Sequence, residues 1–140
     1  MKTVLVGILS AGIAGAFLPG CALLGGAGPR MNASPTVPAA EGRVKFGGAS
    51  NGNTSIDLTV KHLADPARLT PPANNYVVWV RASKNAAAQN IGALSVDKNL
   101  TGTLNTVTAL RTFDLFITAE GSGQVQLPTG QPLLWTSHSE

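Results

Sequence analysis

Short runs of alternating hydrophobic and polar residues, separated by turn-forming residues, occupy the chain from Gly42 onward. Residues 43–46 and 56–61 alternate strictly, and the Asn51-Gly52 pair between them is a strong short signal for a hairpin turn. A period of two indicates strands with one buried face and one face in solvent. The pattern therefore predicts an antiparallel hairpin at the start of a folded domain.

The same kind of pattern continues to the end of the chain. Tyr76–Val80 is apolar at every position, which predicts a central strand covered on both faces. Residues 113–120 alternate again, with Phe116 left on the outer face. Further strands are predicted over residues 92–96 and 100–106, joined by a turn at 97–99, and over 133–135. About seven short strands predict an all-β fold, an immunoglobulin-like antiparallel β-sandwich.

The first twenty residues have a different character. Lys2 is followed by an uncharged, apolar stretch, after which small residues lead to the only cysteine of the chain, Cys21. This layout is typical of a bacterial secretory signal that ends in a lipobox. The lipobox residues are Leu18, Pro19, Gly20 and Cys21. We therefore expect a signal peptide over residues 1–20 and a lipid on Cys21, which would hold the chain to a membrane.

Two other interpretations of this segment stay open. Residues 4–28 carry no charge and are long enough for an uncleaved membrane-spanning helix, although Pro19 and several glycines disfavour it. Ala14-Gly15-Ala16 also fits ordinary signal cleavage. The lipobox favours an extracytoplasmic, lipid-anchored protein of the cell envelope, and Ala22 favours the outer membrane where the cell has one.

Residues 21–41 are predicted to form a flexible linker. They are rich in glycine, proline and alanine and show neither helical nor strand periodicity. We therefore expect that they bury nothing, and that the β-sandwich domain comprises residues 42–140.

Composition narrows the classes of function. The net charge of +3 is small and evenly spread, so the sequence predicts no nucleic-acid partner. Because Cys21 is the only cysteine, the domain has no disulfide, no thiol chemistry and no cysteine metal site.

Several landmarks of the domain recur in a known family. They are Tyr76–Val80, Gly92–Leu94 leading to Asp97, Gly102–Leu104, Phe113–Glu120, and Pro128–Gly130 before Leu133-Leu134. Over residues 42–137 the chain resembles the extracytoplasmic C-terminal domain of the anti-sigma-K factor family. The resemblance implies a β-sandwich.

In that family a sigma-binding segment and a transmembrane helix precede the domain, whereas here we expect a signal peptide. The fold is therefore expected to carry over without the anti-sigma activity, and no functional residue is transferred.

Three motifs resemble catalytic or metal sites. Gly48–Gly52 fits G-x-S-x-G, but a nucleophile elbow needs a strand-turn-helix and this segment leads into a strand, so a hairpin turn is predicted. Residues 97–102 begin like a calcium loop, yet Thr108 stands where a closing glutamate is needed. His62 is expected to face inward as a structural histidine. We expect no catalytic residue, no metal and no cofactor.

The tryptophans and one phenylalanine are the candidate binding residues. Trp79 lies in the apolar strand and is predicted to be core. Trp135, near the end of the chain, and Phe116, on an outer face, are candidate ligand contacts.

The sequence thus predicts a lipid-anchored, non-catalytic binding or structural module whose partner is an unknown protein or envelope component. The alternatives are a carbohydrate-binding module, a stand-alone relative of the anti-sigma-factor sensor domain, and a small hydrolase using Ser50. Exposed aromatic residues on one sheet face would favour sugar binding. A pocket that joins Ser50 to His62 and a carboxylate would favour the hydrolase.

Overall fold

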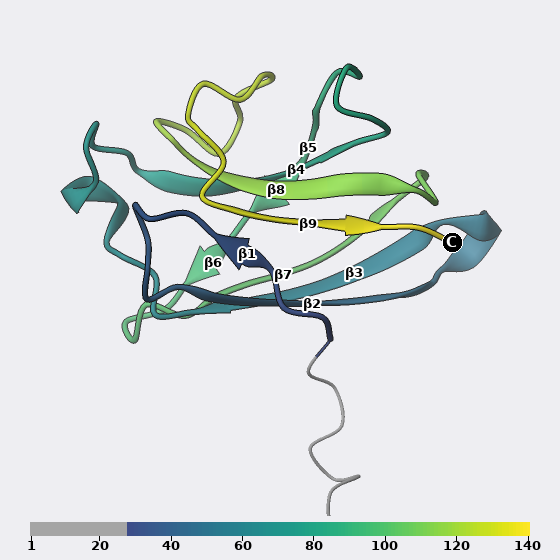
Figure 1. Ribbon diagram of the computed structural model, residues 1–140, viewed down its shortest axis with the longest axis horizontal. Helices are drawn as coiled ribbons and strands as arrows, with labels where there is room; N and C mark the ends of the chain where they lie inside the picture. Colours follow the sequence, from purple (N-terminus) through teal and green to yellow (C-terminus); the bar gives the residue numbers. More distant parts are fainter. Residues whose placement is uncertain (1–27) are drawn as a thin grey trace, which may run out of the picture.

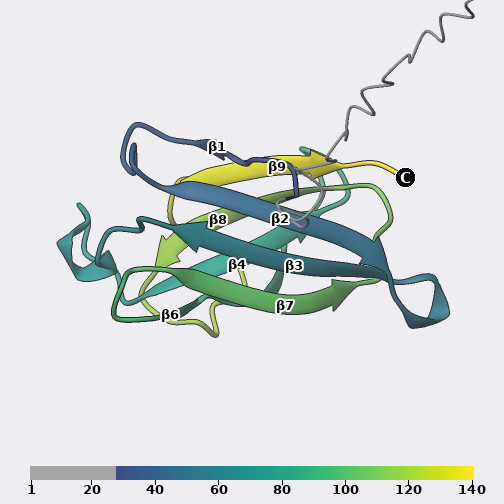
Figure 2. The same ribbon diagram turned by 90° about the horizontal axis from the view of Figure 1, so that it is seen from below.

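The computed structural model describes residues 28–140, which fold into a sandwich of two antiparallel β-sheets (Figure 1). The five-stranded sheet contains, in spatial order, β1 (Asn32–Ala33), β9 (Leu134–His138), β8 (Phe113–Glu120), β4 (Asn75–Arg81) and β5 (Gln89–Ala93). The four-stranded sheet contains β2 (Glu41–Gly48), β3 (Thr54–Lys61), β7 (Gly102–Thr108) and β6 (Ser95–Val96) (Figure 2). The predicted all-β fold is confirmed.

The spatial order of the strands is that of an immunoglobulin-like sandwich. Strands β2, β3, β7 and β6 take the places of A, B, E and D, and β9, β8, β4 and β5 those of G, F, C and C′. Seven strands of the described chain have five residues or more, in agreement with the predicted number. Two short 3-10 turns, η2 (Ser50–Gly52) and η3 (Pro66–Arg68), connect strands. Within residues 28–140, no helix is long and apolar enough to cross a membrane.

The main core lies between the two sheets and follows the alternation of the sequence. On β3, the side chains of Ile56, Leu58 and Val60 are buried, while those of Asp57 and Lys61, which alternate with them, are exposed. The buried side chains that meet between the sheets include Val44, Ile56, Leu58, Val60, Tyr76, Val78, Val80, Leu115 and Ile117. The predicted β2–β3 hairpin is confirmed, and its turn places Asn51 and Gly52 at φ 62° and 72°, a conformation that asparagine and glycine tolerate.

The chain changes sheets in the middle of one predicted strand. Residues 92–96 were expected to form a single arm of a hairpin, but β5 pairs with β4 while β6 pairs with β7 in the other sheet. Leu94 lies at the crossing, where it is buried and its backbone N–H donates to the carbonyl of Tyr76 at 2.8 Å. The turn at residues 97–99 is confirmed, because Asp97 Oδ1 accepts from the backbone N–H groups of Asn99 and Thr101.

The segment before β2 is packed onto the sandwich. Met31, Val37 and Ala40 are buried, and β1 pairs with β9. A side chain on Gly28 would place its Cβ 1.8 Å from the carbonyl oxygen of Val44, so the chain runs directly against β2 from there on. The expectation that residues up to 40 bury nothing is therefore wrong for residues 28–40. Residues 1–27, with the expected signal peptide and the lipobox Leu18–Cys21, lie outside the described residues.

The loop from β3 to β4 differs from expectation at His62. This residue has φ 56° and its side chain is exposed, because the turn at the end of β3 brings Leu63 into the inward position. The Tyr76 hydroxyl fixes the loop by donating to the carbonyl of Ala64 at 2.7 Å. Burial, with a smaller effect of the Asp65 carboxylate, raises the pKa of Tyr76 to about 12.

Candidate binding groove on the outer face of the five-stranded sheet

Three aromatic side chains form a row across the outer face of the five-stranded sheet. Trp79 on β4 pairs in register with Phe116 on β8, and Phe116 pairs with Trp135 on β9. The exposed fraction rises along the row, from 0% for Trp79 to 4% for Phe116 and 41% for Trp135. The Trp79 and Phe116 rings are stacked, with centroids 6.5 Å apart. The row therefore runs from the fully buried Trp79 to the half-exposed Trp135.

A polar row lies two residues farther along the same strands and on the same face. Arg81 pairs with Asp114, and Asp114 pairs with Ser137. Arg81 Nε lies 3.4 Å from Asp114 Oδ2, and Ser137 Oγ donates to Asp114 Oδ1 at 2.8 Å. The two rows are joined because the Arg81 guanidinium lies 5.0 Å from the centroid of the Phe116 ring, a cation–π contact.

The polar row and the two outer members of the aromatic row, Phe116 and Trp135, line a groove of about 480 Å³. Phe116, Asp114, Trp135 and Ser137 contribute from the sheet, as does Arg81 at the end of β4. Figure 1 shows two loops that rise above this face, the β4–β5 loop beyond Arg81 and the β8–β9 loop. The first adds Lys84 to the groove and the second adds Pro132. The groove thus combines an exposed aromatic ring, two cationic groups and one carboxylate.

The remainder of the outer face is covered by the β8–β9 loop, residues 121–133. Val125 from this loop and Ala88 pack against Trp79 and its neighbour Val77. Asn90 Nδ2 on β5 donates to the carbonyl oxygens of residues 123 and 125 at 3.0 and 2.8 Å. Trp79 is therefore core, as predicted, but it belongs to this outer cluster and not to the layer between the sheets.

A buried carboxylate holds the other end of the loop. Glu120 is 1% exposed and accepts from Thr118 Oγ1 at 2.6 Å, from the Thr129 backbone N–H at 2.9 Å, from the Gly130 N–H at 3.3 Å, and from the Thr129 hydroxyl. Thr118 Oγ1 in turn accepts from Trp79 Nε1 at 2.8 Å. Burial alone would raise the pKa of Glu120, but these hydrogen bonds to the ionised form outweigh it and lower the pKa below the ordinary value of 4.5.

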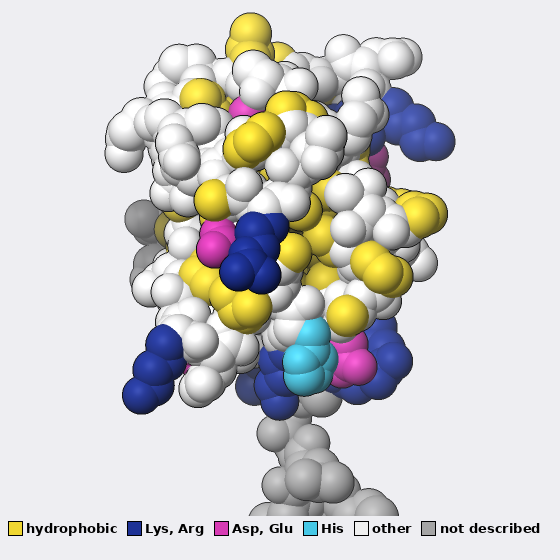
Figure 3. All heavy atoms as spheres, turned by 90° about the vertical axis from the view of Figure 1, so that its left-hand side faces the viewer, with side chains coloured by type: hydrophobic (Ala, Val, Ile, Leu, Met, Phe, Trp, Pro, Cys, Tyr) yellow, Lys and Arg dark blue, Asp and Glu magenta, His cyan; other side chains and the backbone are white. Residues whose placement is uncertain are grey.

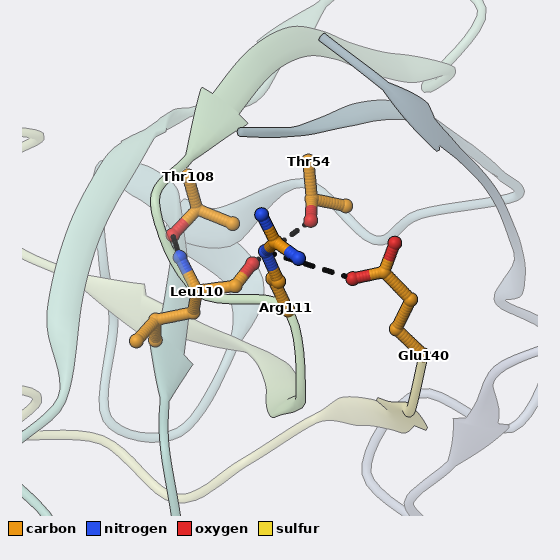
Figure 4. Close-up of polar contacts among 5 residues, drawn as sticks. All are labelled: Thr54, Thr108, Leu110, Arg111 and Glu140. Atoms are coloured by element: carbon orange, nitrogen blue, oxygen red, sulfur yellow. Dashed lines mark hydrogen bonds and ion pairs between the residues drawn. The ribbon is translucent and has the colours of Figure 1, made fainter. Parts of the chain in front are cut away.

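The structure does not bring Ser50 and His62 together. Ser50 precedes β3 and His62 follows it, so the full length of the strand separates them. Ser50 lies in the β2–β3 turn, as predicted. The neighbouring β7–β8 turn is held by side chains shown in Figure 4: Thr54 Oγ1 donates to the Leu110 carbonyl at 2.9 Å, and Arg111 Nε lies 3.7 Å from Glu140 Oε2.

Three other hollows differ from the groove. The one beside the β2–β3 turn, about 280 Å³, also has aromatic rings, a cation and a carboxylate, but the His138 ring stacks on Phe46 with centroids 4.3 Å apart and Arg111 lies beside Glu140. A larger one of about 610 Å³ at the β5 edge has only amide and small side chains. The third hollow lies at the end of the sandwich opposite the β2–β3 turn, where hydrophobic side chains spread among a few charged ones (Figure 3). It has a volume of about 150 Å³ and is lined by Leu69 and Pro71 without a charged group.

Sequence analysis identified two of the groove residues and missed the others. It singled out Trp135 and Phe116, which the structure places side by side. It did not single out Arg81, Asp114 or Ser137, although each stands two residues from one of the row's aromatics and therefore shares its face. Among the described residues, no three histidine, aspartate or glutamate side chains gather where they could hold a metal ion.

Comparisons of the chain with protein-family models, with curated proteins and with solved structures find no match. The resemblance to the anti-sigma-K factor domain therefore stays a prediction.

Proposed function

We propose that this chain is a lipid-anchored, extracytoplasmic β-sandwich that acts as a non-catalytic binding module of the cell envelope. The anchor would be Cys21, and the binding site would be the outer-face groove. The sequence around Cys21 supports the first part, and the half-exposed Trp135 beside the Arg81–Asp114 pair supports the second.

Trp135 is the observation on which the binding role depends. A tryptophan that is 41% exposed beside a groove offers a ligand a flat aromatic surface, and covering that surface on binding is favourable. The groove beside it falls within the ~300–1,000 Å³ range of ligand pockets. It also offers the few oriented polar groups that fix a ligand in such pockets.

The polar groups of the groove favour binding over chemistry. The Asp114 carboxylate accepts from Ser137 and faces Arg81, so these contacts fix its position and leave its other lone pairs open to a ligand. Of the residues that the structure describes, no histidine lines the groove beside Ser137 and Asp114, so the groove holds no Ser–His pair of the kind that activates a nucleophilic serine. The groove therefore resembles a recognition surface whose polar groups are fixed in advance.

The anchor would hold the sandwich close to the membrane. The described residues begin at Gly28, which lies against β2, so at most residues 22–27 would separate the sandwich from a lipid on Cys21. Even fully extended, such a segment reaches only about 20 Å. Because the groove lies on the sheet that does not contain β2, we propose a ligand of the cell envelope and not the membrane surface itself.

Anchoring is tested with a fatty-acid analogue supplied to cells that express the full chain. We expect Cys21 to take up the label and Cys21→Ser to lose it and to leave the membrane fraction, because serine cannot form the thioether. Label that persists in Cys21→Ser would contradict the lipid anchor.

The binding site is tested by placing the photo-crosslinker p-benzoylphenylalanine at position 132 in the full chain, where Pro132 lines the rim of the groove and Trp135 is kept. We expect light-dependent adducts with an envelope component. The same crosslinker at position 107, where Val107 is 53% exposed on the other sheet, should give none. Equal adducts at both positions, or none at 132, would contradict a binding site in the groove.

A further inference from the structure

We propose that the groove binds an acidic saccharide, a sugar chain that carries carboxylate groups. This inference rests on the proposed binding role of the groove and names the chemical class of its ligand. It follows from three properties of the groove: the flat aromatic surface, the mixture of donors and acceptors beside it, and the balance of charge around it.

The aromatic surface suits the face of a sugar ring. The face of an indole is electron-rich, and it attracts the weakly positive C–H groups that a pyranose presents on its apolar face. Trp135 is 41% exposed, while the ring of Phe116 next to it is almost fully buried. Trp135 is held in place because it pairs across the strands with Phe116, and the Phe116 ring in turn stacks on Trp79.

The polar row suits hydroxyl groups, which both donate and accept. The Asp114 carboxylate has about four lone-pair directions. Ser137 Oγ takes one of them and Arg81 faces another, so acceptor sites remain for sugar hydroxyls. Arg81 Nε is itself buried and makes no hydrogen bond, although it faces the carboxylate, so a sugar can be reached only from the exposed part of the side chain, which is 30% exposed as a whole. Donors and acceptors therefore lie together, two residues along the strands from the aromatic row.

The charge around the groove favours an anion. Arg81 and Lys84 contribute two positive charges and Asp114 one negative charge, which leaves a formal charge of +1. Asp114 faces Arg81, whereas Lys84 stands exposed in the β4–β5 loop at the rim. A sugar ring on Trp135 whose carboxylate points toward Lys84 would satisfy both features. A neutral sugar would use only the Trp135 ring and would leave the Lys84 charge without a partner.

The test compares an oligogalacturonate with its methyl ester, which has the same rings without the charge. Binding to the full-length protein is measured by calorimetry, in a detergent that has no sugar headgroup. We expect the acid to bind about two- to fivefold more tightly than the ester, the range of a solvent-exposed ion pair. Because salt screens such pairs, the preference should disappear in about 1 M salt.

Three variants separate the parts of the site. Trp135→Ala should weaken the binding of both sugars at least about fivefold, as expected for the loss of a stacking ring. Lys84→Ala should remove only the preference for the acid. Val107→Ala, an exposed aliphatic change on the other sheet, should change neither.

Each remaining outcome counts against a definite claim. Ester that binds as well as acid, or no binding of either sugar at millimolar concentration, overturns the acidic-saccharide inference. If adducts at position 132 still form in that case, the proposed binding role stands without this ligand. If those adducts are also absent, both proposals fail.

Discussion

At the scale of single residues, a strand's alternation indicates which face a side chain is on but not what covers that face. Thr118 and Glu120 alternate with the core residues of β8 and were expected on the polar side. They do point outward, yet both are buried, because the β8–β9 loop folds over them and supplies the hydrogen bonds that a buried carboxylate requires. The segment 121–130 between β8 and β9 is therefore fixed at both ends.

Glu120→Gln tests this account of the loop. The amide loses the charge that strengthens hydrogen bonds from Thr118, Thr129 and Gly130, so the free energy of unfolding should fall by about 1–3 kcal/mol. Urea denaturation measures the change. The matched control is Glu140→Gln, whose side chain is 65% exposed and only loosely paired with Arg111, and it should be nearly neutral.

The same residue gives a pH dependence with a definite sign. The pKa of Glu120 is lower in the folded chain than its ordinary value of 4.5, so the full stabilisation is present above about pH 4.5. As the pH falls below that value, the unfolded chain takes up the proton first, and stability is lost until the folded pKa is reached. Glu120→Gln should therefore lose less stability on acidification than the parent. An identical acid profile would contradict the ionised, hydrogen-bonded carboxylate.

At the scale of elements, long strands with local turns could be predicted and short strands that depend on distant partners could not. The β2–β3 hairpin carries its own alternation and its own Asn51-Gly52 turn. In contrast, β1 has two residues and no period of its own, and it is a strand only because β9 lies beside it. For the same reason β5 and β6 looked like one strand, although they pair with different sheets.

Met31→Ala tests whether the segment before β2 belongs to the sandwich. Met31 is 8% exposed and packs into the main core, so truncation should lower the free energy of unfolding by about 2–5 kcal/mol. Thr36→Ala, an exposed change in the same segment, should have an effect within about 0.5 kcal/mol. If the segment were a flexible linker, thermal denaturation would give both variants the same melting temperature as the parent.

At the scale of the whole molecule, the candidate site is created by register between strands that are far apart in the sequence. Local patterns could identify Phe116 and Trp135 as outward-facing, but only the pairing of β4, β8 and β9 places Trp79, Phe116 and Trp135 in one row and Arg81, Asp114 and Ser137 in the next. The same pairing explains why two tryptophans of one row have opposite environments. One lies under the β8–β9 loop and the other is open beside it.

The most direct test of the groove is the fluorine NMR spectrum of the full-length protein labelled with 5-fluorotryptophan. The two tryptophans give two resonances, which Trp135→Phe assigns. On titration with oligogalacturonate, the resonance of Trp135 should shift progressively, while that of buried Trp79 should stay in place. A shift confined to Trp79, or no response of either resonance at a saturating concentration, would contradict the groove as the saccharide site.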